Sequence, residues 1–396
     1  MRLLTGICLD WESEMTKEKP IRLGMVGGGR DAFIGAVHRI SARIDGEYQL
    51  IAGALSSTPQ KARESGAALG LSEDRIYEDY KSMAIREARL KEGIDAVAIV
   101  TPNHMHARVA REFLKRGIHV ICDKPLTSTL PDARKMVKAV ESSEALFILT
   151  HNYTGYPMVR QAREMIAAGD LGEIRVVQAE YPQDWLTEAE ETHDNKQAEW
   201  RTDPARSGAG GCVGDIGTHA FNLLSFVTGL ETESLSADLQ SFVPGRRLDD
   251  NVHVMMRFKG GARGMLWSSQ VAPGNENALK IRVYGSKGGL EWAQEDPNYL
   301  WYTPFGKPKQ LLTRGGNGAS SSFAHLIRTP GGHPEGYLEA FANIYSEAAR
   351  AIRAKDAGQP IPEDVHFPTV DDGLKGIQFI DACVRSSQRN AAWIAF

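Results

Sequence analysis

The residues of this sequence best suited to proton and charge chemistry are Lys124, Asp215 and His219. Lys124 lies in the run Cys122-Asp123-Lys124-Pro125, directly after a short apolar segment that is typical of a strand. A desolvated ammonium group at the end of such a strand could bond a substrate oxygen and stabilise negative charge that develops on it. An ordinary surface lysine is the alternative interpretation, and the spacing alone leaves both open.

Asp215 and His219 are four residues apart in a segment that opens an apolar stretch ending at Gly229. On a helix this spacing places both side chains on one face, and Asn222, three residues after His219, joins them. An imidazole can take the proton of an alcohol, and a carboxylate can orient the imidazole or hold a substrate hydroxyl. The alternative is an aspartate N-cap followed by a core histidine, but the glycines that precede Asp215 favour close contact with a ligand.

A group of glycines follows the first apolar run of the chain, Ile21–Val26, and could cradle a pyrophosphate. Glycine lets the backbone turn sharply, and the next helix presents unpaired N–H groups and the positive end of its dipole. A strict G-x-G-x-x-G pattern needs a glycine where Ala32 stands, so we expect a longer loop. The candidate cofactor-binding glycines are Gly27, Gly28, Gly29 and Gly35. A merely tight turn is the alternative.

Other residues at strand ends could complete a dinucleotide site. The second strand lacks the acidic residue that usually bonds the adenosine ribose, and Ser56 and Ser57 stand there instead. Their hydroxyls could bond a ribose or a 2′-phosphate, which leaves NAD and NADP open, and a serine helix cap is an equal alternative. The residues after the third strand are expected to line the cofactor, because ligands bind at the carboxyl edge of a parallel sheet. They are Thr101, Pro102 and Asn103.

Two different patterns along the chain must position these residues. Up to residue 150, short apolar runs alternate with helical segments, which predicts βαβ units and a parallel sheet. The expected strands are 21–26, 48–55, 95–100, 119–122 and 146–150, and the expected helices are 35–44, 59–69, 106–116 and 130–143.

Beyond residue 150, β-type runs separated by glycine turns predict one large, mostly antiparallel sheet. The expected strands are 174–181, 235–242, 252–258, 262–270, 279–284 and 289–292. Helices are expected at 157–168, 336–354 and 371–387, and a long loop is expected over 306–332. The chain is therefore predicted to consist of an N-terminal extension (1–19) and two domains (20–150 and 151–396).

The composition excludes several classes of function. The 396 residues carry 46 Lys and Arg against 50 Asp and Glu, and this net charge of −4 provides no basic field for nucleic acid or an anionic membrane. No apolar run reaches the roughly 18 residues of a membrane span. The four cysteines show no C-x-x-C spacing and no histidine pair has ligand spacing, so we expect no disulfide framework and no metal. A reducing compartment, the cytoplasm, is the expected location.

Taken together, these motifs resemble the Gfo/Idh/MocA oxidoreductases, named for glucose-fructose oxidoreductase and inositol dehydrogenase. The resemblance runs from about Ile21 to the C-terminus. It rests on the glycine turn, on Asp123-Lys124-Pro125 in the place of the family's Glu-Lys-Pro, and on Asp215 and His219 as its Asp-x-x-x-His element. Three departures are the longer glycine loop, the missing ribose-binding acid, and Asn222 where many relatives have a second aspartate.

The resemblance implies an α/β protein with an N-terminal Rossmann domain, which has a doubly wound parallel sheet. It implies a C-terminal α/β domain with a large, mostly antiparallel open sheet, which binds the substrate and forms a homodimer or homotetramer. It also implies NAD or NADP as cofactor and a sugar, cyclitol or related polyol as a small-molecule substrate. Lys124, Asp215 and His219 match the catalytic positions of the family.

Further polar and aromatic residues suit a carbohydrate pocket, because rings pack on sugar C–H faces while amides, carboxylates and guanidinium groups bond hydroxyls. These candidates are Tyr153, Tyr156, Gln183, Asp184, Trp185 and Arg201. Asp184-Trp185 and Trp200-Arg201 look similar to members that oxidise anhydrosugars or glycosides. Core or turn roles for these aromatic residues stay open.

The resulting hypothesis is reversible hydride transfer between a secondary alcohol and a nicotinamide, without a metal. His219 takes the hydroxyl proton, Lys124 bonds the same oxygen, and Asp215 orients the histidine or a neighbouring hydroxyl. The alternatives are a cofactor-binding sensor without turnover, a dihydrodiol dehydrogenase, and a glycosidase that cycles NAD internally.

Overall fold

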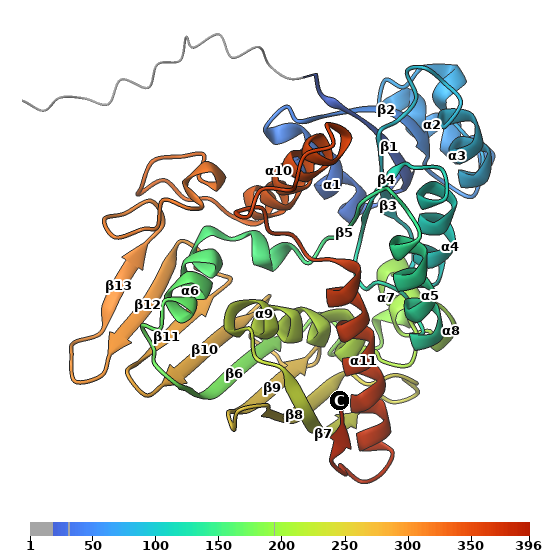
Figure 1. Cartoon of the computed structure of the whole chain (residues 1–396). Coiled ribbons are helices and arrows are strands. Elements are labelled where there is room, and N and C mark those ends of the chain that lie inside the picture. The colour runs from blue at the N-terminus through green and yellow to red at the C-terminus, as the bar shows by residue number, and fades with distance from the viewer. Residues whose placement is uncertain (1–18, 31, 194) are drawn as a thin grey trace, which may run out of the picture.

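A computed structural model of the chain describes residues 19–30, 32–193 and 195–396 (Figure 1). It contains two β-sheets, one of five strands and one of nine. The predicted fold class, a parallel sheet followed by a large and mostly antiparallel one, is confirmed. The predicted extension over 1–19 lies outside the described residues, apart from Lys19.

The five-stranded sheet has the strand order β2-β1-β3-β4-β5, and all its pairs are parallel. Its strands are β1 (Ile21–Gly27), β2 (Tyr48–Ala54), β3 (Ala96–Val100), β4 (His119–Cys122) and β5 (Phe147–Leu149). The connecting helices are α1 (Phe33–Ile44), α2 (Pro59–Ala68), α3 (Tyr80–Glu87), α4 (Asn103–Leu114) and α5 (Leu130–Glu141). A single parallel bridge between Gly53 and Ile76 lies beyond β2, where a doubly wound sheet has a further strand.

The helices of this half differ from the prediction at α4 and at α3. α4 begins at Asn103, three residues before the predicted start, because Pro102 supplies the N-cap and the helix follows it at once. The sequence pattern gives no signal for α3. That helix is started by Asp79, whose carboxylate accepts the backbone N–H groups of Lys81 and Ser82.

The nine-stranded sheet has the order β13-β12-β11-β10-β6-β9-β8-β7-β14. Its strands are β6 (Ile174–Pro182), β7 (Thr232–Gln240), β8 (Asn251–Phe258), β9 (Arg263–Ser269), β10 (Lys280–Gly285), β11 (Gly288–Ala293), β12 (Tyr299–Pro304), β13 (Gln310–Thr313) and β14 (Ile394–Ala395). Only β6 and β9 pair in parallel, and the other neighbours are antiparallel. The predicted loop over 306–332 is wrong where β13 pairs with β12, because Leu311 and Leu312 form too short an apolar run to indicate a strand.

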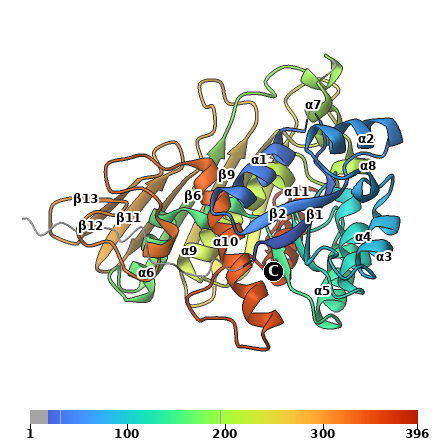
Figure 2. The same cartoon turned by 90° about the horizontal axis from the view of Figure 1, so that it is seen from above.

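Three helices cover one face of the nine-stranded sheet: α6 (Pro157–Ala167), α9 (Thr218–Thr228) and α11 (Val370–Ser387). Figures 1 and 2 show α6 and α9 on the same side of this sheet. Alternate side chains of the strands point into this layer and form one apolar cluster with the helices, as the alternation of buried and exposed residues in β8 illustrates. The side chains on the other face have no covering helix among the described residues.

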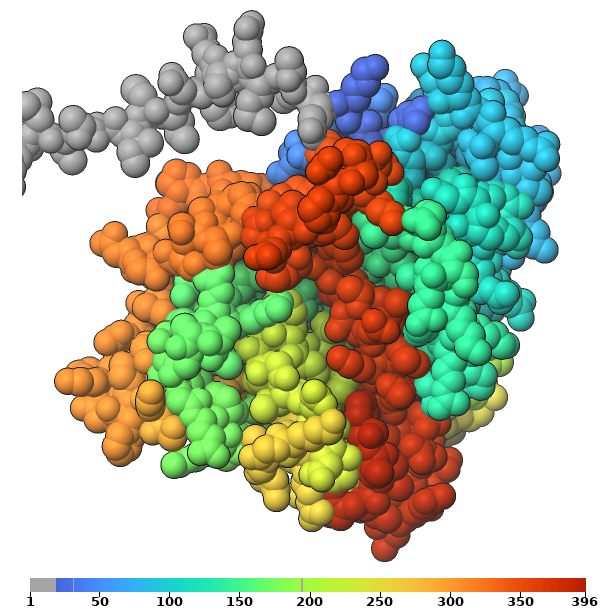
Figure 3. Space-filling view, in the orientation of Figure 1, coloured from blue at the N-terminus to red at the C-terminus, as the bar shows by residue number. Residues whose placement is uncertain are grey.

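The helix α10 (Tyr337–Asp356) follows the strands β6–β13 of the second sheet in the chain but packs against the first sheet. Its apolar face joins one buried cluster with β1 and α1, in which Phe341, Ile344 and Tyr345 contact the layer of Leu23 and Val37. Figures 1 and 2 show α10 beside α1, and the space-filling view shows the red C-terminal residues lying between the blue-cyan and green-yellow parts (Figure 3). A helix from the C-terminal part of the chain thus covers part of the N-terminal half.

The structure also bears on the predictions about disulfide bonds and membrane spans. Cys122, Cys212 and Cys383 are buried and free, whereas Cys8 lies outside the described residues. Among the helices that the structure describes, none combines the length and apolar character that a membrane crossing requires.

Candidate active site

A cavity of about 970 Å³ lies between the two sheets. On the N-terminal side it is lined by residues that directly follow β3, β4 and β5, which is the carboxyl edge where open α/β sheets bind ligands. On the other side it is lined by residues of the nine-stranded sheet and of the segments before α9. The candidates that the cavity brings together are Thr101, Pro102, Asn103, Lys124, Tyr153, Gln183, Trp185, Arg201, Asp215 and His219.

Lys124 and Asp215 form the central ion pair of this cavity. The Lys124 Nζ donates to Asp215 Oδ1 at 2.9 Å and to the Asp215 backbone oxygen at 2.7 Å. Both side chains are mostly buried, with 16% and 13% of their surface exposed. Lys124 follows β4, whereas Asp215 belongs to the segment before α9, so this pair joins the two halves of the molecule.

Two further groups hold the second oxygen of the Asp215 carboxylate. Arg201 Nε donates to Asp215 Oδ2 at 3.1 Å, and Gln270 Nε2 donates to it at 3.0 Å. Burial alone would raise the pKa of Asp215, but the charges of Lys124 and Arg201 outweigh it and hold this pKa well below the usual range. The guanidinium group of Arg201 also stacks on the ring of Trp200, 4.3 Å from its centre.

The segment that carries Asp215 is a π-helical turn, Val213–Gly217, which continues directly into α9. The Asp249 carboxylate accepts the backbone N–H groups of Gly211 and Val213, both at 2.7 Å. Gly211 has to be glycine, because a Cβ there would lie 2.3 Å from the Asp249 backbone oxygen. Burial raises the pKa of Asp249 to about 6. These contacts fix the start of the turn, and π-helical turns often occur at functional sites.

His219 lies on α9 and is 7% exposed. Its Nδ1 is 3.4 Å from His151 Nδ1, and the two rings are perpendicular at 88°. The ring of Tyr153 packs edge-on against it, with ring centres 4.8 Å apart. Burial, with the nearby charge of Lys124, lowers the pKa of His219 well below its ordinary value. Among the described residues, no hydrogen bond joins the Asp215 carboxylate to the His219 ring.

A network of polar side chains forms the wall beside His219. The hydroxyl groups of Tyr153 and Tyr181 are hydrogen-bonded, and Tyr181 donates onward to Asn277 Oδ1 at 2.7 Å. Gln183 also donates to Asn277 Oδ1 at 2.7 Å, and Trp185 Nε1 donates to Gln183 Oε1 at 3.1 Å. This wall can offer hydroxyl, amide and aromatic groups to one ligand.

Three predicted substrate residues do not line this cavity. Asn222 is buried on α9. Asp184 Oδ2 accepts the backbone N–H of Gly274 at 3.1 Å. Tyr156 lines an adjoining hollow of about 620 Å³, which shares Glu276, Asn277, Gln294 and Tyr337 with the main cavity.

Sequence reasoning missed several residues of the cavity. Asn152 follows β5 and could have been found by the same carboxyl-edge rule that selected Thr101. Tyr337 and Phe341 come from α10, and no local pattern indicates that this helix returns to the first sheet. Asn277 and Gln294 lie in turns of the second sheet, where their positions depend on strand pairing.

The glycine loop between β1 and α1 fits the close approach of a pyrophosphate. Gly27 and Gly28 have φ values of +78° and +65°, which favour glycine. A Cβ on Gly35 would lie 2.4 Å from the Gly28 backbone oxygen, so the first turn of α1 needs a glycine where it packs against the loop. Ala32, at the N-terminus of α1, lines the cavity, whereas the predicted cofactor glycines Gly27, Gly28, Gly29 and Gly35 are not among its lining residues.

Two polar atoms of the cavity residues support a bound ligand. Thr101 Oγ1 and Asn152 Nδ2 are buried without a partner among the described residues, and both side chains belong to the cavity wall. A nicotinamide dinucleotide carries the polar groups that such atoms require, so the residues fit this cofactor. Ser56 and Ser57 do not line the cavity, and Ser56 Oγ accepts the Thr58 backbone N–H at 3.1 Å.

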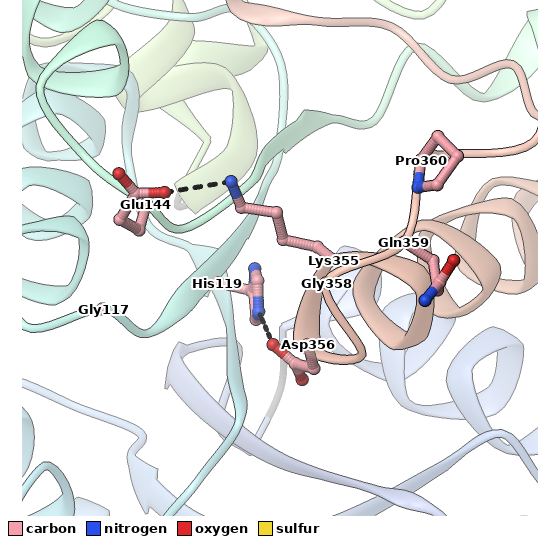
Figure 4. A pocket seen from close by; sticks show the side chains of 8 residues that line it. All are labelled: Gly117, His119, Glu144, Lys355, Asp356, Gly358, Gln359 and Pro360. Atoms are coloured by element: carbon pink, nitrogen blue, oxygen red, sulfur yellow. Dashed lines mark hydrogen bonds and ion pairs between the residues drawn. The ribbon is translucent and has the colours of Figure 1, made fainter.

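Two other findings concern the rest of the surface. A separate pocket of about 600 Å³ lies between the end of α10 and the amino-terminal end of β4, and its charged groups are already paired (Figure 4). There His119 contacts Asp356 at 3.0 Å and Lys355 contacts Glu144 at 3.1 Å.

Among the described residues, no cluster of three or more His, Cys, Asp or Glu could hold a metal ion.

Comparisons with known proteins match both halves of the chain. Residues 21–151 match the model of the oxidoreductase family with an NAD-binding Rossmann fold, and residues 159–291 match the GFO/IDH/MocA C-terminal domain. The uncharacterized oxidoreductase YfiI of Bacillus subtilis is 36% identical, over 96% of this chain and 97% of that protein.

Two solved structures are similar over nearly the whole chain. An oxidoreductase from Sinorhizobium meliloti is 64% identical, with a TM-score of 0.86 over 95% of this chain and 100% of that one. An inositol dehydrogenase homolog from Azotobacter vinelandii, complexed with NADH and myo-inositol, is 36% identical, with a TM-score of 0.90 over 96% of this chain and 98% of that one.

Proposed function

Because the chain belongs to the Gfo/Idh/MocA family of oxidoreductases, we propose that it is an NAD-dependent dehydrogenase that oxidises a secondary alcohol of a cyclitol or sugar. The observation that carries this proposal is the convergence of Lys124 and His219 on one cavity from opposite halves of the molecule. In the oxidation of an alcohol, a neutral imidazole can take the hydroxyl proton and an ammonium can stabilise the charge that develops on the oxygen.

The bound nicotinamide supplies the acceptor of the hydride from the carbon of the alcohol. The glycine loop and the residues Thr101, Pro102 and Asn103 would hold it, together with Lys124. Ser56 and Ser57 lie outside the cavity lining, as the glycines of the loop do, so the cavity gives no preference between NAD and NADP at the adenosine end of the cofactor.

His219 is the proposed base. Its lowered pKa keeps the imidazole neutral at physiological pH, so that a lone pair is available for the hydroxyl proton. The reaction then leaves one proton on the ring, and the nearby carboxylate of Asp215 compensates part of the new charge.

Lys124 is the proposed partner of the substrate oxygen. An ammonium group has three N–H donors, and two of them are used by Asp215. The third is free, among the described residues, to donate to the alcohol oxygen and to stabilise the charge that grows there.

Asp215 is proposed as the group that holds the two cations. Its carboxylate stays ionised because Lys124 and Arg201 lower its pKa, and it fixes both side chains in the cavity wall. With this chemistry supplied by Lys124, His219 and Asp215, the proposed mechanism uses no metal.

The substrate is proposed to be a small polyol bound by the wall beside His219. Tyr153, Gln183, Trp185 and Arg201 offer an aromatic surface and several hydrogen-bonding groups within one cavity. The myo-inositol bound to the Azotobacter vinelandii relative supports a cyclitol as the first compound to test.

The open face of the nine-stranded sheet is proposed to contact a second copy of the chain. It exposes apolar side chains at Met255, Met265 and Trp301, which are 56%, 50% and 42% exposed. Met255 and Met265 are cross-strand partners, so they form a continuous patch. A patch of this kind on a sheet face favours association into a homodimer or homotetramer.

The test is a screen of absorbance at the nicotinamide band, with NAD and NADP each paired against inositols, aldoses, 1,5-anhydrosugars and glycosides. We expect reduced cofactor to form with at least one polyol, and His219→Gln to lower kcat by roughly 10²–10⁴-fold, the usual contribution of a general base. A His219→Gln variant with full activity would show that another group is the base. Tight cofactor binding without turnover on any compound would favour a sensor instead.

A further inference from the structure

The tautomer of His219 decides whether its ring can act as a base. A neutral imidazole carries one hydrogen, so the nitrogen that faces the substrate must be the one without it. His219 Nδ1 is engaged with His151 Nδ1 at 3.4 Å. Its Nε2 has no partner among the described residues and is not sealed from solvent, and the side chain lines the cavity. Nε2 is therefore the atom that can meet a substrate.

We propose that His151 is a positioning residue that accepts the Nδ1 hydrogen of His219 and so leaves the lone pair of His219 Nε2 free to take the substrate proton. This inference rests on the proposed role of His219 as base. It gives the orienting task to His151, where the sequence motif alone gives it to Asp215.

The hydrogen bonds of Asp215 explain why it does not orient His219. Its Oδ1 accepts from Lys124, and its Oδ2 accepts from both Arg201 and Gln270. The carboxylate is thereby occupied by donors other than the imidazole. His151 is the partner within hydrogen-bonding distance of a His219 ring nitrogen in the described chain.

The backbone around His151 is held firmly enough to position a ring. The residue follows β5, and its own backbone oxygen accepts both the hydroxyl of Thr154 at 2.9 Å and the Thr154 backbone N–H at 3.2 Å. The His151 side chain is 2% exposed. His219 also makes an edge contact with the Tyr153 ring, so two buried neighbours restrict the imidazole.

The direction of the hydrogen bond follows from the charges around the two rings. The charge of Lys124 acts on both histidines, that of Asp123 also acts on His151, and that of Asp215 also acts on His219. A lone pair turned toward the cavity is favoured there over an N–H, because the Lys124 ammonium lies in the same wall. Burial lowers the pKa of His151 to about 3, so this ring stays neutral and keeps an acceptor for the His219 hydrogen.

The decisive experiment is 15N NMR of the histidine side chains in the full-length protein without substrate, at neutral pH. The His219 signals are assigned by their loss in His219→Gln. We expect Nδ1 of His219 to be protonated and Nε2 to be unprotonated in the wild type. The inference is overturned if the wild type carries the hydrogen on Nε2. Since this readout needs no turnover, it can fail while the His219→Gln activity test still supports the proposed function.

Two variants of His151 provide the kinetic counterpart. His151→Leu keeps the bulk and removes the acceptor, so we expect the His219 hydrogen to redistribute between its nitrogens. We expect kcat to fall by roughly 10–100-fold, as on removing a group that orients a catalytic ligand, with KM and the Kd for NADH near wild-type values. His151→Asn places an amide oxygen close to the position of Nδ1 and should recover most of the loss.

Other results would count against the positioning role. A His151→Leu enzyme with wild-type kcat overturns it. So does a loss of kcat that His151→Asn does not recover while both variants show wild-type melting temperatures. If His151→Leu does not fold, the wild-type spectrum and His151→Asn still decide the question.

Discussion

At the scale of single residues, Asp215 is the centre of the site although it is not the proposed base. Its two oxygens and its backbone carbonyl together accept from Lys124, Arg201 and Gln270. Lys124 follows β4 of the first sheet, Arg201 ends a short helix, and Gln270 follows β9 of the second sheet, so one carboxylate of the cavity wall connects three separate segments of the chain. The loss of one donor leaves the carboxylate paired, and the fold should survive it.

This reasoning yields a prediction for Lys124. Lys124→Met removes the ammonium, while Arg201 and Gln270 still hold Asp215. We expect kcat to fall by roughly 10²–10³-fold, the usual cost of losing one donor to a developing negative charge, with NADH binding retained. Steady-state kinetics and a fluorescence titration with NADH measure both quantities.

Lys115→Met is the matched control, because Lys115 is an exposed lysine of the same half and pairs only with Glu112 among the described residues. It should leave kcat unchanged. A Lys124→Met variant whose KM rises while kcat stays constant would mean that Lys124 binds the substrate without stabilising charge.

Residue types and spacing predicted part of the site. Lys124, Asp215 and His219 could be selected because each follows a strand end or a glycine-rich approach, and the cavity does contain all three. The sequence does not indicate a role for His151, because its partner His219 is 68 positions away in the chain and no short pattern links the two residues. Asn222 was selected for its spacing from His219, but helical spacing does not indicate which part of the helix surface borders a cavity.

At the scale of elements, the start of α1 is the most constrained feature of the cofactor side. Gly28 adopts a positive φ, and Gly35 packs directly against it. The helix begins at Phe33, and its N-terminus lines the cavity beside the glycine loop. An added methyl group at Gly35 has to push the loop away from the helix, and the position of the loop determines how closely a pyrophosphate can approach.

We therefore predict that Gly35→Ala weakens NADH binding at least several-fold and lowers the free energy of unfolding by roughly 1–3 kcal/mol, the usual cost of overpacking. Binding is measured by NADH fluorescence, and stability is measured by urea unfolding. Gly376→Ala is the control, since Gly376 is also helical but a Cβ there meets nothing within 4 Å. It should stabilise the chain by about 0.5–1 kcal/mol. Equal NADH affinity in both variants would contradict the role given to the loop.

The elements of the first sheet were predictable because each strand is a short apolar run followed by a turn. The bounds of β4 match the predicted 119–122, and those of β1 extend by one residue, to Gly27. The sequence does not predict β12 and β13, since this edge hairpin buries Leu300 but exposes Trp301 and Leu311, so it shows no clear apolar run. The π-helical turn at Val213–Gly217 was also not predicted, because backbone contacts with Asp249 determine it.

At the scale of the whole molecule, the two faces of the nine-stranded sheet differ. One face carries helices and a continuous apolar core, whereas the other shows apolar side chains with no cover among the described residues. The resemblance to a family led to the expectation of an oligomer, but the alternation of side chains in β8 and β9 indicates which face is free. The sequence predicts the strands of this sheet, but it does not predict which face the helices cover.

We predict that replacing both Met255 and Met265 with Glu converts an oligomer into a monomer. The two residues lie side by side on the neighbouring strands β8 and β9, so the contact between subunits would have to desolvate two adjacent charges. Light scattering after size exclusion gives the mass. Ile85→Glu is the control, since Ile85 is 41% exposed on α3, far from this sheet in the fold. A wild-type protein that is monomeric at micromolar concentration would refute the proposed contact.

The return of α10 to the first sheet has a consequence for synthesis on the ribosome. The parallel sheet is complete by Leu149, but the helix that seals its apolar layer begins only at Tyr337. A nascent chain therefore lacks the part of the cover over Leu23 and Val37 that α10 supplies, and this lasts until the strands β6–β13 have been translated. Independent folding of the nucleotide-binding half is thereby delayed, and the nascent chain depends on α10 to cover the remaining apolar surface of this half against aggregation.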